Sequence, residues 1–214
     1  MGAPMPLRHI SKKKTVVVLR CISPHDEEKQ KQHCREIPMS SQEAEQNWQE
    51  DVFRVLKAHD VKHVVFVPDA GHSASIRMSY ADPDIKAVVL TTEEEGIGYL
   101  AGAWLGGERG ALLMQSSGVG NCINTLALQN CAGFPLLMVV TMRGDWAEFN
   151  AWQNPMGQAT EASLNLMKVM TWRADKPEDV APLLHGAATM AFNGDAATAL
   201  LLGQRLIGEK KWVK

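Results

Sequence analysis

The sequence lacks a strong excess of charge of either sign, a long hydrophobic run and cysteine pairs at metal-binding spacing. Its formal net charge is −2 over 214 residues, which excludes the basic footprint typical of nucleic-acid binding. No apolar run approaches the roughly 18 residues that indicate a membrane-spanning helix. The four cysteines include no Cys-x-x-Cys pair, so neither a zinc site nor a redox dithiol is predicted. Cys122 and Cys131 are expected to be buried free thiols in a reducing, cytoplasmic setting.

Three signature motifs of common α/β enzymes are also missing. No Gly-x-Ser-x-Gly elbow is present, so a hydrolase triad is unsupported. The turn Ser-Ser-Gly-Val-Gly-Asn at 116–121 has no following Gly-Lys-Ser/Thr, and Ile123 stands where the third glycine of a dinucleotide fingerprint belongs. A nucleotide-dependent dehydrogenase is therefore unsupported. The turn is equally consistent with a phosphate site at the start of a helix and with a plain tight turn.

The first 40 residues differ from the rest of the chain. Basic residues from Arg8 to Arg20 precede any acidic residue, and a dense mixed-charge run follows at 26–31. This opening is weakly similar to an organelle transit peptide but lacks the serine-rich, amphipathic character of one. We expect a poorly ordered extension over residues 1–40 and one folded domain over residues 41–214.

The rest of the chain alternates short apolar segments with helical patterns. The expected strands cover residues 64–67, 87–90, 111–115, 136–141, 169–172 and 198–202. The expected helices cover residues 43–59, a segment through Ile76, residues 93–106, a segment that follows the turn at 116–121 and runs through Asn130, and residues 160–166 and 177–192. Short, fully apolar strands between helices predict an α/β fold, a doubly wound parallel sheet with helices on both faces.

Ligands of such sheets bind at loops beyond the carboxyl ends of the strands. Four segments are expected there, at residues 68–72, 91–95, 116–121 and 141–145. Together they supply carboxylates, a histidine, an arginine and a glycine turn. Because every sheet of this kind has polar loops at that edge, position alone is modest support for a site.

Three consecutive glutamates, Glu93, Glu94 and Glu95, open one of the expected helices. Their side chains point about 100° apart around the helix axis, so they cannot share one direction. Thr92 and Glu95 have capping-box spacing, which predicts a local structural role for Glu95. Glu93 is expected to be solvated near the positive end of the helix dipole. Glu94 is left as the carboxylate that points into a protein or subunit interface, with a solvated position as the alternative.

Three motifs carry a family resemblance: Glu-Glu-Gly at 94–96, Leu-Ala-Gly-Ala-Trp at 100–104 and Gln-Ser-Ser-Gly-Val-Gly-Asn at 115–121. In these motifs the chain resembles the pyrimidine-binding domain of thiamine-diphosphate enzymes. The likeness is greatest to sulfopyruvate and phosphonopyruvate decarboxylases, and it covers residues 46–203. It implies a non-oxidative decarboxylase of a small anionic 2-oxoacid, with sulfopyruvate converted to sulfoacetaldehyde and carbon dioxide.

The resemblance also implies roles for particular residues. Glu94 would hydrogen-bond N1′ of the cofactor's aminopyrimidine ring, where a carboxyl group is needed because the proton is shared with the ring. Further cofactor contacts would come from Ser117, Gly118 and Asn121.

On the substrate side, Asp69 and His72 would orient the substrate or relay protons. Arg143 would lie near the second anion of the substrate. For Arg143 the alternative is an ion pair with Asp145 or Glu148.

The Gly-Asp-Gly motif that holds the diphosphate and Mg²⁺ in this family is missing, and Asn-Gly-Asp-Ala at 193–196 is the nearest string. The resemblance therefore implies a hetero-oligomer with a beta subunit that carries the diphosphate-binding domain. Trp104, Met114 and Trp152 are expected at a large apolar interface with it. Two alternatives stay open: another thiamine-diphosphate decarboxylase or carboligase half, and a non-catalytic regulatory or assembly subunit.

Overall fold

The computed structural model describes residues 47–209. The expected extension over residues 1–40 and the start of the domain at residue 41 lie outside the described residues. No helix within 47–209 combines the length and hydrophobicity needed to cross a membrane.

A single six-stranded sheet forms the centre of the described part, in the order β2-β1-β3-β4-β6-β5. Every neighbouring pair is parallel, which confirms the predicted doubly wound α/β fold. The buried strands consist of apolar side chains on both faces, as a sheet covered on both sides requires. The strands are β1 (Val61–Phe66), β2 (Lys86–Val89), β3 (Arg109–Gln115), β4 (Leu136–Thr141), β5 (Met170–Ala174) and β6 (Ala197–Leu202).

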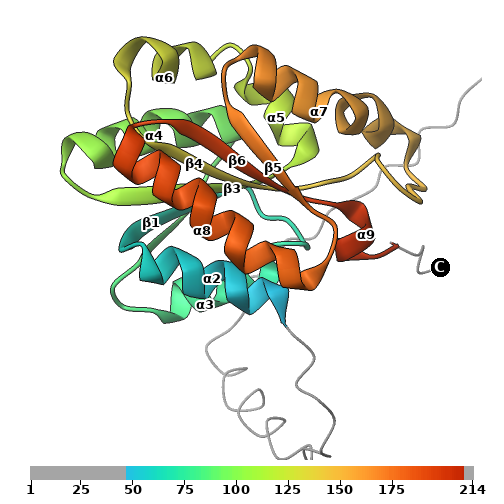
Figure 1. The fold of residues 1–214 in the computed structure, drawn as a ribbon, viewed down its shortest axis with the longest axis horizontal. Helices are drawn as coiled ribbons and strands as arrows, with labels where there is room; N and C mark the ends of the chain where they lie inside the picture. The colour runs from blue at the N-terminus through green and yellow to red at the C-terminus, as the bar shows by residue number, and fades with distance from the viewer. Residues whose placement is uncertain (1–46, 210–214) are drawn as a thin grey trace, which may run out of the picture. The chain divides into compact units, whose positions relative to one another are not determined.

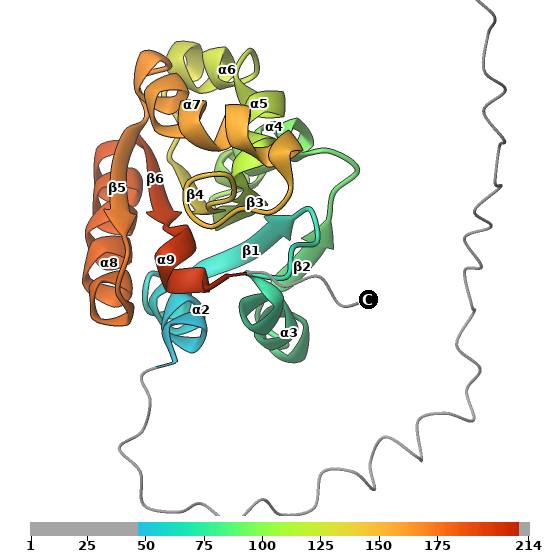
Figure 2. The same ribbon diagram turned by 90° about the vertical axis from the view of Figure 1, so that its right-hand side faces the viewer.

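Helices cover both faces of this sheet (Figure 1). One face carries α4, α5, α6 and α7, which Figure 2 shows together above the strands. The other face carries α2, α3 and α8. The helices are α2 (Trp48–Ala58), α3 (Ser73–Ala81), α4 (Glu93–Leu105), α5 (Ser116–Cys122), α6 (Leu126–Ala132), η2 (Ala151–Gln153), α7 (Asn154–Leu166), α8 (Pro177–Gly194) and α9 (Gln204–Ile207).

The strands divide their apolar side chains between two cores. In β3, Leu112 and Met114 point to the core under α4 to α7, and Ala111 and Leu113 point to the core under α2 and α8. Burying a side chain of this size stabilises the fold by about 1.5–3 kcal/mol. Met114 is fully buried, so its expected place at a subunit interface is wrong.

Two other expectations about the segment after β3 are corrected. The turn expected over residues 116–121 is itself helical and forms α5. The chain leaves the helix at residues 123–125, and the helix expected to run through Asn130 is the separate α6. Glycine, asparagine and threonine are weak helix formers and are frequent here. Cys122 is buried, as expected, and burial raises the pKa of its thiol to about 12. Cys131 is exposed.

Candidate active site

The carboxyl ends of the strands place the starts of α4 and α5 against each other. Helix α4 begins at Glu93 just beyond β2, and α5 follows β3 without a break. Gly118 in the first turn of α5 faces α4, and Asn121 follows one turn later. These two residues were expected at the site, and the structure brings both of them to Glu93 rather than to Glu94.

Glu93 is buried, with 8% of its surface exposed, so its expected solvation is wrong. The Nδ2 atom of Asn121 donates a hydrogen bond of 2.8 Å to Oε2 of Glu93. A Cβ atom on Gly118 would lie 2.4 Å from Cδ and Oε1 of the same carboxyl group. Glycine is therefore required for the carboxyl group to lie where it does. Burying a carboxylate is energetically costly. Here the hydrogen bond from Asn121 and the space over Gly118 accommodate it.

The other two glutamates of the triplet take different positions. Glu94 is half-buried and Glu95 is exposed. Oε2 of Glu95 accepts a hydrogen bond of 2.8 Å from the backbone N–H of Thr91, whereas the side chain of Thr92 makes no capping bond. The local structural role of Glu95 is confirmed, but the capping partner is one residue earlier than the spacing predicts.

A pocket of about 740 Å³ opens beside this cluster. Its lining is mostly apolar, and Ser117 and Asn121 supply polar atoms to it. Oγ of Ser117 donates a hydrogen bond of 2.9 Å to Oε1 of Gln115. The lining consists of Ser117, Asn121, Ala151, Trp152, Pro155 and Met156. An apolar pocket with a few polar groups is typical of a small-molecule binding site.

Asp69 connects three strand ends at the same edge. Its Oδ1 accepts a hydrogen bond of 3.0 Å from Nε2 of Gln115, the last residue of β3, and its Oδ2 accepts one of 2.6 Å from Oγ1 of Thr141 in β4. The backbone N–H of Gly71 donates to the same Oδ2 at 3.0 Å. These bonds assign Asp69 a structural role in holding the loops that form the site.

His72 lies below the edge rather than on it, with 1% of its surface exposed. Its Nε2 lies 3.2 Å from the carbonyl oxygen of Met114 and 3.1 Å from that of Val139, so this nitrogen carries the proton. Nδ1 has no hydrogen-bond partner among the described residues. Burial lowers the pKa of His72, which keeps the ring neutral while it connects β3 to β4.

Arg143 forms an ion pair with Glu148, one of the two carboxylates expected as its alternative partners. Nε and Nη2 of Arg143 donate to Oε2 and Oε1 of Glu148 at 2.5 and 2.6 Å. Asp145 is paired with Arg173 instead. The bidentate bond holds the pKa of Glu148 down at about 2, despite burial.

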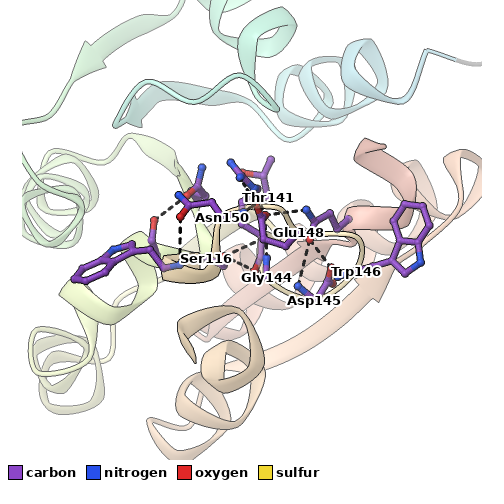
Figure 3. Close-up of polar contacts among 12 residues, drawn as sticks. Ser116, Thr141, Gly144, Asp145, Trp146, Glu148 and Asn150 are labelled. Atoms are coloured by element: carbon purple, nitrogen blue, oxygen red, sulfur yellow. Dashed lines mark hydrogen bonds and ion pairs between the residues drawn. The ribbon is translucent and has the colours of Figure 1, made fainter. Parts of the chain in front are cut away.

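Glu148 is the centre of the loop after β4 (Figure 3). It also accepts hydrogen bonds from the backbone N–H of Asn150 at 3.0 Å and from Nε2 of Gln204 at 2.9 Å. Oε1 of Gln204 in turn accepts from the N–H groups of Asp145 and Trp146. No sequence motif indicated Gln204, because it reaches this loop from α9. The loop carries three exposed aromatic side chains, Trp146, Phe149 and Trp152.

Within residues 47–209, no three histidine, cysteine or carboxylate side chains lie close enough to hold a metal ion. The string nearest to a Gly-Asp-Gly motif ends α8, where Asp195 adopts a left-handed conformation as the C-cap. Glu93, Gly118 and Asn121 thus lie together at one edge of the sheet, and Asn121 also lines the adjoining pocket.

Comparison with known proteins identifies the family of the chain. Residues 46–161 match the family described as thiamine pyrophosphate enzyme, N-terminal TPP binding domain. The chain is 35% identical over 157 residues to sulfopyruvate decarboxylase subunit alpha of Methanococcus maripaludis, with 73% of this chain and 94% of that protein covered. It is 32% identical over 151 residues to the protein of the same name from Methanocaldococcus jannaschii, covering 70% of this chain and 89% of that protein.

Two further likenesses extend over a smaller part of the other protein. Phosphonopyruvate decarboxylase of Streptomyces viridochromogenes is 34% identical over 124 residues, which are 57% of this chain and 31% of that protein. A solved 2-oxoglutarate:ferredoxin oxidoreductase from Magnetococcus marinus has a TM-score of 0.62 at 12% identity, covering 77% of this chain and 33% of that chain; it is evidence for the fold alone. From its sequence and its fold, this chain belongs to the thiamine pyrophosphate enzymes, as their N-terminal TPP binding domain.

Proposed function

We propose that the chain is the pyrimidine-binding subunit of a thiamine-diphosphate-dependent decarboxylase that converts sulfopyruvate to sulfoacetaldehyde and carbon dioxide. Support for this substrate comes from relatives named sulfopyruvate decarboxylase subunit alpha, which the chain matches over 89–94% of their length. Phosphonopyruvate is the second candidate, since phosphonopyruvate decarboxylases match over 24–31% of theirs. The observation that carries the proposal is the buried Glu93 carboxyl group over Gly118.

Glu93 is proposed to hold and exchange a proton at N1′ of the aminopyrimidine ring. When bound, thiamine diphosphate supplies a thiazolium ring that accepts the electron pair released as carbon dioxide leaves. A carboxyl group suits the task at N1′, because it both donates and accepts a proton. Aspartate at this position is one methylene shorter, and glutamine cannot exchange the proton.

The family resemblance implied this role for Glu94, and Glu94 stays the rival candidate. Three observations favour Glu93: its burial, its hydrogen bond to Asn121, and the absence of a side chain on Gly118. Glu94 is half-buried and points about 100° away around the helix axis. A partner chain that covers Glu94 would be needed to give it a dry environment.

The other predicted site residues take supporting places in this proposal. Ser117 lines the pocket beside Asn121 and is proposed to contact the cofactor. Asp69 and His72 are proposed to act by holding strand ends in place, in addition to the substrate roles expected from the sequence. Nε and Nη2 of Arg143 both donate to Glu148. Arg143 therefore binds a substrate anion only if Glu148 shares or releases the guanidinium group.

The proposal includes a second chain that supplies the diphosphate and Mg²⁺ site, in a cytoplasmic hetero-oligomer. It is supported by the relatives' name, subunit alpha, and by the absence of Gly-Asp-Gly from the sequence. The described cysteines, Cys122 and Cys131, are both free thiols, as expected in a reducing compartment.

The test is to co-express the full chain with a candidate partner that carries Gly-Asp-Gly. With thiamine diphosphate and Mg²⁺ added, carbon dioxide release is measured from sulfopyruvate and from phosphonopyruvate. Glu93→Gln is expected to lose at least about 100-fold in turnover, while Glu161→Gln, an exposed glutamate on α7, keeps it. Full turnover by Glu93→Gln contradicts its role. A stable complex that binds no cofactor supports the regulatory alternative instead.

A further inference from the structure

Another cavity, of about 220 Å³, lies at the amino ends of the strands, on the edge of the sheet opposite the candidate active site. It opens where α4 and α8 end and where β3 and β4 begin. Pockets for drug-sized ligands have about 300–1,000 Å³, so this cavity fits a smaller molecule. Its lining includes Trp104, Glu108, Arg109, Pro135, Phe192 and Asp195.

The guanidinium group of Arg109 is held in place at this cavity. Its Cζ atom lies 5.0 Å from the centre of the Phe192 ring, and its Nη1 donates a hydrogen bond of 3.1 Å to the carbonyl oxygen of His59. Nε and Nη2 have no acceptor within residues 47–209. A guanidinium edge with two free donors matches a carboxylate in both geometry and charge. Because the group is already fixed, binding a carboxylate there costs little further ordering.

The carboxylate of Asp195 lines the same cavity and is also unpaired. It has no hydrogen bond or ion pair with any other described residue, whereas Oε2 of Glu108 lies 2.6 Å from Nε2 of His63. Asp195 is the C-cap of α8 and adopts a left-handed conformation, with φ at 48°. The negative end of the helix dipole therefore lies beside the Asp195 carboxylate, and both favour a cation.

These two opposite charges do not pair with each other. No ion pair within 4.0 Å joins Arg109 and Asp195 in the described part of the chain, so the cavity separates them. Aromatic rings supply its apolar surface: Phe192 under the guanidinium group, and Trp104, whose ring centre lies 6.3 Å from that of Phe134. The cavity thus presents one free cation, one free anion and apolar surface to the same small ligand.

We propose that this cavity binds a zwitterionic α-amino acid with an apolar side chain. The carboxylate of the ligand binds Nε and Nη2 of Arg109, its ammonium group binds Asp195, and its side chain contacts Trp104 and Phe192. The site is independent of the proposed function, because it lies across the sheet from the candidate active site. It also gives Trp104 a place other than the subunit interface expected from the sequence.

The test is isothermal titration of the full chain with three probes of matched shape. They are L-leucine, 4-methylpentanoate, which lacks the ammonium group, and 3-methylbutylamine, which lacks the carboxylate. L-Leucine is expected to bind with a Kd of about 1 mM, which is usual for so small a ligand. Each analogue is expected to bind at least about tenfold more weakly, because it leaves one charge of the cavity unpaired.

Two variants assign the charges. Asp195→Asn should weaken L-leucine binding about tenfold and leave 4-methylpentanoate unchanged; asparagine adopts the left-handed cap conformation readily, so the fold is kept. Arg109→Gln should likewise weaken L-leucine and leave 3-methylbutylamine unchanged. Glu178→Gln is the control, since Glu178 is an exposed carboxylate in the first turn of α8, and its Kd should stay within about twofold of the wild type. A general loss of packing weakens all three probes alike.

Three results would overturn the inference. If L-leucine does not bind at concentrations well above the expected Kd, the two charges are simply solvated. If either analogue binds as tightly as L-leucine, one of the two charges takes no part. If Asp195→Asn binds L-leucine as the wild type does, the ammonium group is not held there. Because none of these readouts is turnover or cofactor binding, failure here leaves the proposed function of the chain untouched.

Discussion

Gly118 lies so close to Glu93 that a Cβ atom on the glycine would be 2.4 Å from Cδ and Oε1 of the carboxyl group. Real Cβ atoms do not approach other atoms this closely, so any larger residue at 118 displaces the carboxyl group. The glycine turn predicted as a phosphate site or a plain tight turn thus has a third use, which is to admit a buried carboxyl group from the neighbouring helix.

Gly118→Ala is therefore expected to lower turnover of the assembled enzyme by about 100-fold, because a displacement near 1 Å at a reacting group has this effect. Stability should change little, since the atom in the way is the end of a flexible side chain. Gly186→Ala is the matched control, because a Cβ atom there meets nothing within 4 Å. Unchanged turnover in Gly118→Ala would mean that the position of Glu93 is not critical.

Glu148→Gln is expected to destabilise the chain at pH 7 by about 3 kcal/mol, the value of lowering a carboxyl pKa from its usual 4.5 to about 2. The substitution removes the charge that pairs with the buried Arg143. Chemical denaturation of the two proteins measures the difference. Glu161→Gln, on an exposed glutamate, should stay within about 0.5 kcal/mol of the wild type.

The contribution of Glu148 also has a defined pH dependence. Because the folded state lowers its pKa, the stabilisation is complete above about pH 4.5 and is lost as the pH falls toward 2. The difference between wild type and Glu148→Gln should shrink across that window. If the difference in unfolding free energy between the two proteins is constant from pH 7 to pH 2, the substitution acts through packing rather than through the loss of charge.

His72→Ala is expected to lower stability by about 2 kcal/mol, because it removes the donor to the carbonyl groups of Met114 and Val139. Burial lowers the pKa of His72 in the folded state, so its contribution is complete above the unfolded pKa near 6.5 and is lost as the pH falls below it. In His72→Ala, the free energy of unfolding should therefore lack the decrease that His72 causes as the pH falls below about 6.5. An identical pH dependence in both proteins would show that His72 does not titrate on unfolding.

The sheet was predictable because its signal is local. β4 was expected at residues 136–141 and occupies Leu136–Thr141, since Pro135 ends the preceding loop and six apolar residues follow. Fully buried strands that alternate with helices are compatible with few architectures other than a covered parallel sheet. The break between α5 and α6 was missed because the apolar spacing continues across it, although the residues there are weak helix formers.

The candidate site was harder to predict because its contacts are not local. The spacing of the three glutamates separates their directions but does not say which one faces inward. That depends on Gly118 and Asn121, and Asn121 is 28 residues away from Glu93 in the chain. Likewise the choice of Glu148 over Asp145 as the partner of Arg143 depends on Gln204, 56 residues beyond Glu148.

The central claim is that Glu93, rather than Glu94, exchanges the proton with the cofactor's aminopyrimidine ring. Exchange of the C2 proton of bound thiamine diphosphate for deuterium reports this step before any substrate reacts, and rapid quenching with NMR measures its rate in the assembled enzyme. The account predicts that Glu93→Gln slows this exchange by at least about 100-fold, while Glu94→Gln stays near the wild-type rate. Slow exchange in Glu94→Gln with normal exchange in Glu93→Gln would contradict it.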